Sequence, residues 1–308
     1  MPTALITGAT SGIGRDAARR LGERGWRVLV HGRDAEAGAE TVARVEDAGG
    51  EASFHGADFA DLDAIRAFAD TVREEVDELD ALCNNAGLAI NDYRESEQGF
   101  EMHFAVNHLA GYLLTHELVD LLADDGRVVN TASVAHRNGD IDFEEIREHG
   151  RTGVPGITGA TELASLRKLG QATGVTEATG LNGFALYSNS KLCNVLFTTE
   201  LARRLDEGQL CNCFHPGIIP GSGVGRDLAF PGSMLWESLD LVPGVSDTVA
   251  DGGTAMAMLA ADPSIDVTGQ YFNKQRQARA SPRARDEDRA TRLWALSADL
   301  VDVDPNWP

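Results

Sequence analysis

The chain has 308 residues, 43% of them hydrophobic, so it can bury the core of one large domain or two small ones. Acidic residues outnumber basic ones by 48 to 27, which gives a formal net charge of −21 at pH 7. This balance excludes a nucleic-acid-binding surface, which needs clustered Lys and Arg, but a nucleotide cofactor needs only a local positive pocket.

The first third of the chain alternates short apolar runs with helical patterns. Strands are predicted at 4–7, 27–31 and 52–55, and helices at 15–24, 36–47 and 62–76. This βαβαβ order is typical of a parallel sheet with helices on both faces.

Four more strands are predicted at 79–83, 127–131, 210–215 and 269–272, with helices at 97–122, 187–205, 248–261 and 286–300. Together they predict one α/β domain over 1–308, a Rossmann-type, doubly wound, seven-stranded parallel sheet. Two irregular stretches interrupt it. Residues 137–183 are interpreted as an insertion near the active site, with helical fragments at 143–148 and 162–169, and residues 218–246 as a substrate lid.

The cysteines and the N-terminus indicate a cytoplasmic protein. The four cysteines lie in apolar segments without paired spacing, so we expect buried, reduced thiols and no metal site: Cys83, Cys193, Cys211 and Cys213. No signal peptide or membrane-spanning run is visible. A GC-rich genome would explain why Arg outnumbers Lys, but the carboxylate excess favours salt adaptation, in which ions screen self-repulsion.

A glycine-rich segment links the first strand to the first helix and predicts a pyrophosphate site. Glycines there allow a tight turn and a close approach of main-chain N–H groups, while the helix N-terminus attracts an anion. The cofactor-binding residues expected in it are Gly8, Thr10, Ser11, Gly12, Ile13 and Gly14.

The end of the second strand favours NADP(H), with NAD(H) still possible. NAD-selective folds place an acidic residue here, whereas this chain has Gly32 followed by Arg33, a cation suited to a 2′-phosphate. In the alternative interpretation, Arg33 is a solvated turn residue and Asp34 supplies the acid.

Tyr187 and Lys191 stand four residues apart, on one face of a predicted helix. A nearby ammonium and an oxidised nicotinamide would both favour the phenolate, so we expect the pKa of Tyr187 to move down toward working pH. The phenol would then serve as a general acid or base.

With these residues in place, the sequence resembles the short-chain dehydrogenase/reductase family over essentially its whole length. The resemblance is carried by the glycine segment and by further motifs at successive strand ends: Asp58, Asn84 to Gly87, Asn107, Ser133, Tyr187 with Lys191, and Pro216-Gly217. It implies hydride transfer between a nicotinamide and a small-molecule substrate.

The resemblance also implies roles for individual residues. Ser133 would bind the substrate oxygen, Tyr187 would transfer the proton, and Lys191 would hold the nicotinamide ribose. Asn107 would hold a water that relays protons from Lys191 to solvent, and Asp58 would bind the adenine amino group. Further cofactor contacts are implied at Asn85, Ala86, Gly87, Pro216, Gly217, Ile218 and, more weakly, Ser222.

Within the family, the segments around Asn107, Ser133 and Lys191 look most like the retinol dehydrogenase and protochlorophyllide reductase branch. The insertion contains no Cys, unlike that of the light-driven reductases. We therefore expect a carbonyl or alcohol substrate, hydrophobic because the predicted lid is apolar. The alternatives are reduction of a carbon–carbon double bond and a catalytically silent NADP-binding redox sensor; homo-oligomerisation stays open.

Overall fold

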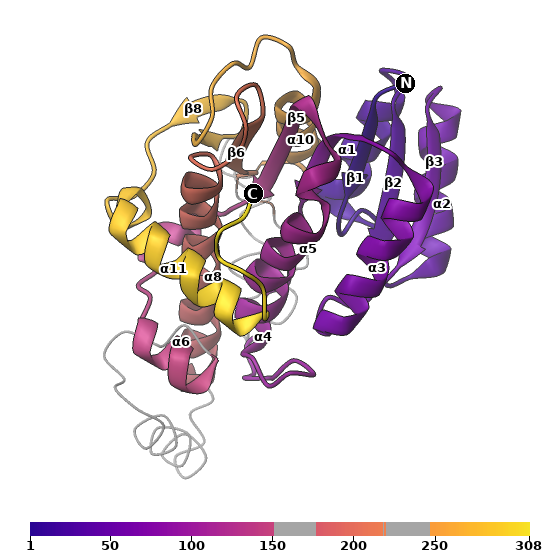
Figure 1. Ribbon diagram of the computed structural model, residues 1–308. Coiled ribbons are helices and arrows are strands. Elements are labelled where there is room, and N and C mark those ends of the chain that lie inside the picture. The colour runs from indigo at the N-terminus through magenta and orange to yellow at the C-terminus, as the bar shows by residue number, and fades with distance from the viewer. Residues whose placement is uncertain (151–176, 218, 220–246) are drawn as a thin grey trace.

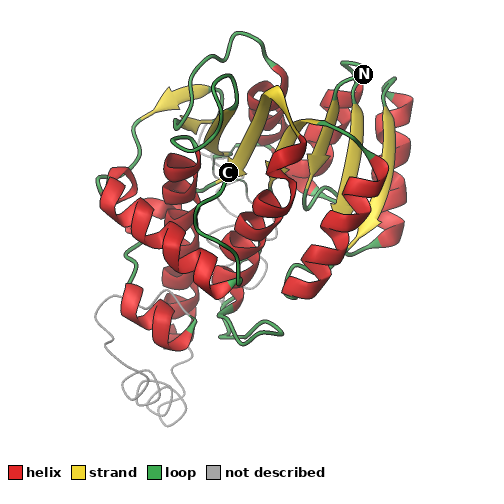
Figure 2. Ribbon diagram, in the orientation of Figure 1, coloured by secondary structure: helices red, strands yellow, loops and turns green. Residues whose placement is uncertain are grey.

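The computed structural model describes residues 1–150, 177–217, 219 and 247–308. The predicted helical fragment 162–169 and nearly all of the predicted lid lie outside these ranges. The chain forms a central sheet with helices on both faces (Figures 1 and 2).

The sheet has eight strands in the order β3-β2-β1-β4-β5-β6-β7-β8. Their bounds are β1 Thr3–Ile6, β2 Arg27–Gly32, β3 Glu51–Gly56, β4 Leu79–Asn84, β5 Leu122–Thr131, β6 Leu210–His215, β7 Tyr271–Asn273 and β8 Arg276–Ala278. The first seven are parallel, as predicted, and the order reverses between β1 and β4. That reversal is the switch point where such sheets bind ligands.

The prediction of seven strands was one short, because β8 pairs with β7 in an antiparallel hairpin. Each strand of this hairpin has three residues, too few to show the alternation by which strands are recognised in a sequence. Lys274 makes the turn with a positive φ of 54°.

The helices of the described residues are α1 Gly12–Gly22, α2 Ala35–Asp47, α3 Leu62–Glu75, α4 Met102–Phe104, α5 Ala110–Leu118, α6 Phe143–His149, α8 Glu177–Leu201, α10 Val249–Ala261 and α11 Glu287–Leu300. The helix predicted over 97–122 is not continuous, since a π-helical turn, η1 Ala105–Leu109, separates α4 from α5 and β5 already begins at Leu122. Helix α8 begins ten residues before the predicted start, inside the stretch interpreted as an insertion.

Two hydrophobic clusters cover the faces of the sheet. One joins alternate strand residues such as Ile6 and Val30 to α1 and α10. The other joins residues such as Leu5 and Leu82 to α3, α5 and α8, with α11 packed on α8. Strand side chains alternate between faces, and each buried aliphatic side chain contributes about 1.5 to 3 kcal/mol. The sheet is therefore held rigidly beneath the site.

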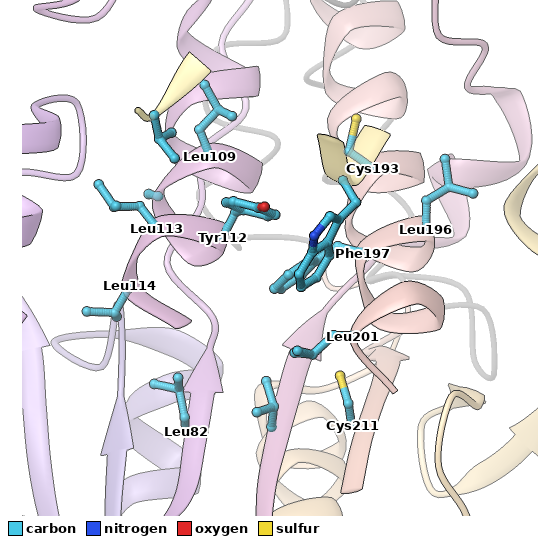
Figure 3. Packing of buried hydrophobic residues seen from close by; sticks show 14 of the residues in the cluster. Leu82, Leu109, Tyr112, Leu113, Leu114, Cys193, Leu196, Phe197, Leu201 and Cys211 are labelled. Carbon is cyan, nitrogen blue, oxygen red and sulfur yellow. The ribbon is translucent and has the colours of Figure 1, made fainter. Parts of the chain in front are cut away.

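An aromatic cluster closes the second face. Tyr112 of α5 and Phe197 of α8 face each other across the core (Figure 3). Trp294 of α11 packs on both, and Trp307 donates its indole N–H to the Tyr112 hydroxyl at 3.0 Å. These contacts fix α8, which carries Tyr187 and Lys191.

All four cysteines are buried and unpaired, as predicted. Burial raises the pKa of Cys83 and of Cys213 to about 12, so their thiols stay protonated at neutral pH. Among the described residues, no helix combines the length and the apolar character needed to span a bilayer.

Candidate active site and cofactor cradle

The N-terminus of α1 differs from those of α2, α3, α6 and α11. Helices α2, α3, α6 and α11 each begin after an Asp whose carboxylate accepts main-chain N–H groups. Ser11, which precedes α1, makes no such bond. A Cβ added to Gly12 would meet no atom of the described residues within 4 Å. The first N–H groups of α1 are thus open to an anionic group, which fits a pyrophosphate.

The other two glycines of the segment are required by close packing. A Cβ at Gly8 would lie 2.8 Å from the Ala86 Cα, and one at Gly14 would lie 2.6 Å from the Gly8 carbonyl oxygen. Thr10 packs its methyl group over Gly32, and its carbonyl accepts a hydrogen bond from Arg15. The loop therefore sits directly on the ends of β2 and β4.

The side chain of Ile13 points away from the loop. A Cβ added at Gly252 of α10 would lie 2.9 Å from the Ile13 Cγ1 atom. Only the main chain of Ile13 is therefore placed to meet a cofactor.

Thr7 and Asn85 brace β1 to β4 at the carboxyl edge of the sheet. The Thr7 hydroxyl oxygen accepts the main-chain N–H groups of Asn85 and Ala86, at 2.9 and 3.0 Å. The Asn85 amide donates to the carbonyls of Thr7 and Gly8. Thr7 was missed by sequence reasoning, because a hydroxyl at a strand end has no distinctive spacing.

Arg33 and Asp58 meet beside the carboxyl ends of β2 and β3. The Arg33 Nη1 atom lies 3.8 Å from the Asp58 Oδ2 atom, and the side chains are 72% and 53% exposed. The Asp34 carboxylate instead accepts the Ala37 N–H and caps α2. Asp34 thus has a structural task at the start of α2, and Arg33 presents an exposed guanidinium beside it.

Ser133 and Tyr187 come together from different elements. Ser133 follows β5 and caps the short 3-10 helix η3 (Val134–Asn138) by accepting the Ala135 N–H at 3.2 Å. Tyr187 lies on α8, 8% exposed, and its hydroxyl forms a hydrogen bond with the Ser133 side chain. The two hydroxyls predicted to act on one substrate oxygen are therefore adjacent.

Lys191 lies one turn further along α8 and is 4% exposed. Its ammonium donates to the Thr131 carbonyl at 3.1 Å and lies 5.7 Å from the centre of the Tyr187 ring. Burial lowers the pKa of Lys191 to about 8, because the charged form loses its hydration. Asn194 donates to the same carbonyl at 3.1 Å.

The expected direction of the Tyr187 pKa shift is wrong for the protein alone. Burial raises the pKa of Tyr187 above its ordinary value of 10, and the hydrogen bond with Ser133 offsets this only in part. Desolvation disfavours the phenolate, and sequence spacing does not show how deeply a side chain is buried. The protein without cofactor therefore keeps Tyr187 as a neutral phenol.

Asn107 lies in the π-helical turn η1 and holds the loop that follows Gly87. Its amide nitrogen donates to the Leu88 carbonyl at 3.0 Å and to the Ser190 hydroxyl at 2.9 Å, and its oxygen accepts the Leu88 N–H at 2.7 Å. A Cβ at Gly87 would lie 3.1 Å from the Asn107 Oδ1 atom and 3.4 Å from the Lys191 Nζ atom. Gly87 thus lies close to both side chains.

Sequence reasoning also missed a buried Glu101–His103 pair beside Tyr187. The His103 Nδ1 atom lies 2.6 Å from the Glu101 Oε1 atom, and both side chains are buried. His103 Nε2 accepts the Ile90 N–H at 3.0 Å, and the ring meets that of Tyr187 edge-on at 6.2 Å between centroids. The pair thus connects the loop after β4 to Tyr187. The spacing of Glu101 and His103 in the sequence does not show that both are buried.

Pro216 and Gly217 follow β6 at the same edge. Gly217 has a φ of 98°, and its N–H donates to His215 Nδ1 at 3.1 Å. This φ favours glycine, and a Cβ there would also lie 2.2 Å from an oxygen of Asp247. The predicted contacts Ile218 and Ser222 lie outside the described residues.

Comparison with known proteins places this site in a family. The sequence profile described as short chain dehydrogenase matches residues 2–144. Human retinol dehydrogenase 13 is 35% identical over 98% of this chain and 85% of its own length. A solved structure from Mycobacterium paratuberculosis is 27% identical, with a TM-score of 0.66 over 99% of this chain and 94% of that one.

A short chain dehydrogenase from Shigella flexneri, solved in complex with NADP, matches in fold at 21% identity. Its TM-score is 0.63 over 89% of this chain and 97% of its own. The matching profile, the relatives that align over nearly the whole chain and the shared fold all indicate the same family. The chain belongs to the short-chain dehydrogenase/reductase family and is an NAD(P)-dependent oxidoreductase.

Proposed function

We propose that this enzyme transfers a hydride between NADP(H) and the carbonyl or alcohol carbon of a hydrophobic small molecule. The observation that carries the proposal is the adjacency of Ser133, Tyr187 and Lys191 at the switch-point edge of the sheet. Retinol dehydrogenase 13, to which the chain is similar, is named for an alcohol oxidation.

The proposed reaction divides between cofactor and chain. The bound nicotinamide would supply or accept the hydride. In the reductive direction Ser133 donates a hydrogen bond to the substrate oxygen, and Tyr187 delivers the proton from its hydroxyl oxygen. A neutral Tyr187 phenol in the protein alone suits this donor role. Lys191 holds its positive charge between Tyr187 and Gly87, where the nicotinamide ribose would lie.

The cofactor cradle supports NADP(H) as the preferred cofactor. The open N-terminus of α1 would take the pyrophosphate, and the exposed Arg33 guanidinium would meet a 2′-phosphate with charge-assisted hydrogen bonds. Asp58 would contact the adenine. Asn85, Ala86, Gly87 and Gly217 would border the nicotinamide half.

Exposed apolar side chains beside the catalytic residues support a hydrophobic substrate. Val134 directly follows Ser133 and is 38% exposed, and Phe184 precedes Tyr187 by three residues on α8 and is 49% exposed. A hydrophobic substrate that covered these side chains would remove their apolar surface from water, which favours binding.

Turnover of a substrate panel tests the proposal. Purified protein is incubated with NADPH or NADP⁺ and with aldehydes, ketones, alcohols and enones of increasing chain length, and cofactor absorbance is followed. We expect kcat/KM to rise with apolar chain length among carbonyls and alcohols. Turnover confined to the enones would establish double-bond reduction instead, and binding of NADPH without any turnover would indicate a redox sensor.

We also infer a salt-adapted enzyme of a reducing cytoplasm. The four unpaired buried thiols fit a reducing compartment, and the net charge of −21 fits a medium in which ions screen repulsion. The melting temperature should rise as KCl increases from low to molar concentration. A flat or falling melting temperature would contradict salt adaptation.

A further inference from the structure

His31 lies near the end of β2, beneath the glycine segment, and is 2% exposed. Its own carbonyl accepts the Ala9 N–H at 2.8 Å. Its ring is stacked on Phe59 with 4.0 Å between centroids and lies 4.8 Å from Phe68. The His31 side chain therefore lies directly beneath the glycine segment.

Both ring nitrogens of His31 bond to the main chain. Nδ1 lies 3.3 Å from the Gly8 nitrogen, whose N–H it accepts. Nε2 lies 3.2 Å from the Ala57 carbonyl oxygen, to which it must donate. Only the neutral tautomer with its proton on Nε2 satisfies both partners. One imidazole thus connects the glycine segment to the end of β3.

The surroundings keep this ring neutral. Burial lowers the pKa of His31 to about 4, outweighing the hydrogen bond to Ala57. The charged or titratable groups that face it are His55, Asp58 and Arg33. The connection is consequently intact throughout the neutral pH range.

We propose that His31 is the positioning residue for the adenosine half of the cofactor site. It holds Gly8, where the pyrophosphate turn begins, at a set distance from Ala57, the residue before Asp58. Arg33 follows His31 by two residues and meets Asp58. His31 thus sets how the turn, Arg33 and Asp58 are spaced. This rests on the proposed NADP(H) function.

The proposal predicts a loss confined to one half of the cofactor. His31 lies among β2, β3 and the glycine segment, whereas Tyr187 and Lys191 lie on α8, which packs over β5 and β6 further along the same face of the sheet. Removing its hydrogen bonds should weaken binding of the adenosine fragment 2′,5′-ADP and leave binding of nicotinamide mononucleotide unchanged. A general loss of packing would weaken both.

Three variants separate the hydrogen bonds from the ring. His31→Phe keeps an aromatic ring against Phe59 and loses both bonds. His31→Gln can retain the donor to Ala57, and His31→Asn can retain the acceptor for Gly8. The matched control is His108→Phe, because His108 is also buried and neutral but bonds to Ser297 of α11.

The dissociation constants of 2′,5′-ADP, NADPH and nicotinamide mononucleotide are measured by calorimetry on each folded protein. We expect His31→Phe to weaken 2′,5′-ADP and NADPH by the same factor, about 10-fold for two hydrogen bonds. His31→Gln and His31→Asn should lose less, and His108→Phe should bind like the unmutated protein. In turnover the loss should appear in KM for NADPH rather than in kcat.

An unchanged affinity of His31→Phe for 2′,5′-ADP would overturn the proposal, as would an equal loss for both fragments. If His31→Phe does not fold, the polar variants decide by the same fragment comparison. Failure of the unmutated protein to bind 2′,5′-ADP would count against NADP(H) as cofactor, and the His31 comparison would then use ADP. The two failures are therefore distinguishable.

Discussion

The two ends of the cofactor cradle use charge in different ways. At the adenosine end, Arg33 and Asp58 are largely exposed and stand 3.8 Å apart. At the nicotinamide end, Lys191 and Tyr187 are almost wholly buried. Burial lowers the pKa of Lys191 and raises that of Tyr187, so it favours the neutral form of both. Water and salt screen the first pair but not the second. We therefore expect salt to affect the proposed cofactor preference, which depends on the exposed pair, more than the proposed chemistry, which depends on the buried pair.

The largest expected effect is at the buried end. Tyr187→Phe removes only the phenolic oxygen and keeps the ring against His103. Turnover should fall by roughly 10²- to 10⁴-fold, the range for loss of a general acid or base, while NADPH affinity changes little. Steady-state kinetics and calorimetry measure both. Near-normal turnover of a correctly folded variant would refute the proposed chemistry.

Lys191 should make cofactor binding depend on pH. Its pKa of about 8 means that the ammonium is present at pH 7 and is lost as pH rises through 8. NADPH affinity should therefore decline between pH 7 and 9. Lys191→Ala should bind NADPH more weakly at pH 7 and show no such decline, and its pH–rate profile should move upward. A pH-dependent decline that persists in Lys191→Ala would assign the titration to another group.

Buried neutral histidines at both ends should make the fold sensitive to acid. Burial lowers the pKa of His31 and of His215 to about 4, from 6.5. Below pH 6.5 these histidines are protonated in the unfolded chain but stay neutral in the folded one. The free energy of unfolding therefore falls as the pH is lowered from 6.5 to about 4. Each group costs up to about 1.4 kcal/mol per pH unit. Urea unfolding of His31→Gln should show a smaller loss between pH 6.5 and 5 than the unmutated protein.

The smallest effect is expected at the exposed end. Arg33→Ala should reduce the preference for NADPH over NADH by about three- to tenfold, less than a buried charge-assisted hydrogen bond would give. The preference of the unmutated protein should also shrink as KCl is raised, because salt screens the exposed guanidinium. Binding titrations of both cofactors at two salt concentrations measure this. Equal affinities for both cofactors in the unmutated protein would contradict the role of Arg33.

Features with a local physical signature could be predicted from the sequence. The seven parallel strands follow from alternating apolar runs and helices, and the glycine segment follows from the strict backbone demands at Gly8 and Gly14. Tyr187 and Lys191 are neighbours because helical spacing dictates it. Each of these inferences needs only short-range geometry.

Features that depend on burial or distant contacts could not be predicted. The direction of the Tyr187 pKa shift follows from desolvation by segments far away in sequence. The tasks of His31 and the Glu101–His103 pair appear only once β2, β3 and α8 are assembled. The β7–β8 hairpin is too short to leave a pattern, and the sequence does not show that Asp34, the acidic residue of the alternative interpretation, caps α2.

The π-helical turn η1 implies that the active site depends on one residue of chain length. Such a turn accommodates one residue more than an α-helical turn. Deleting a single codon, that for Val106, would let the segment relax to regular helix and rotate Glu101 and His103 by about 100° relative to Asn107. The bonds of His103 to Ile90 and of Asn107 to Leu88 could not then form together. The contacts in this part of the site therefore depend on the number of residues in the segment as well as on their side chains.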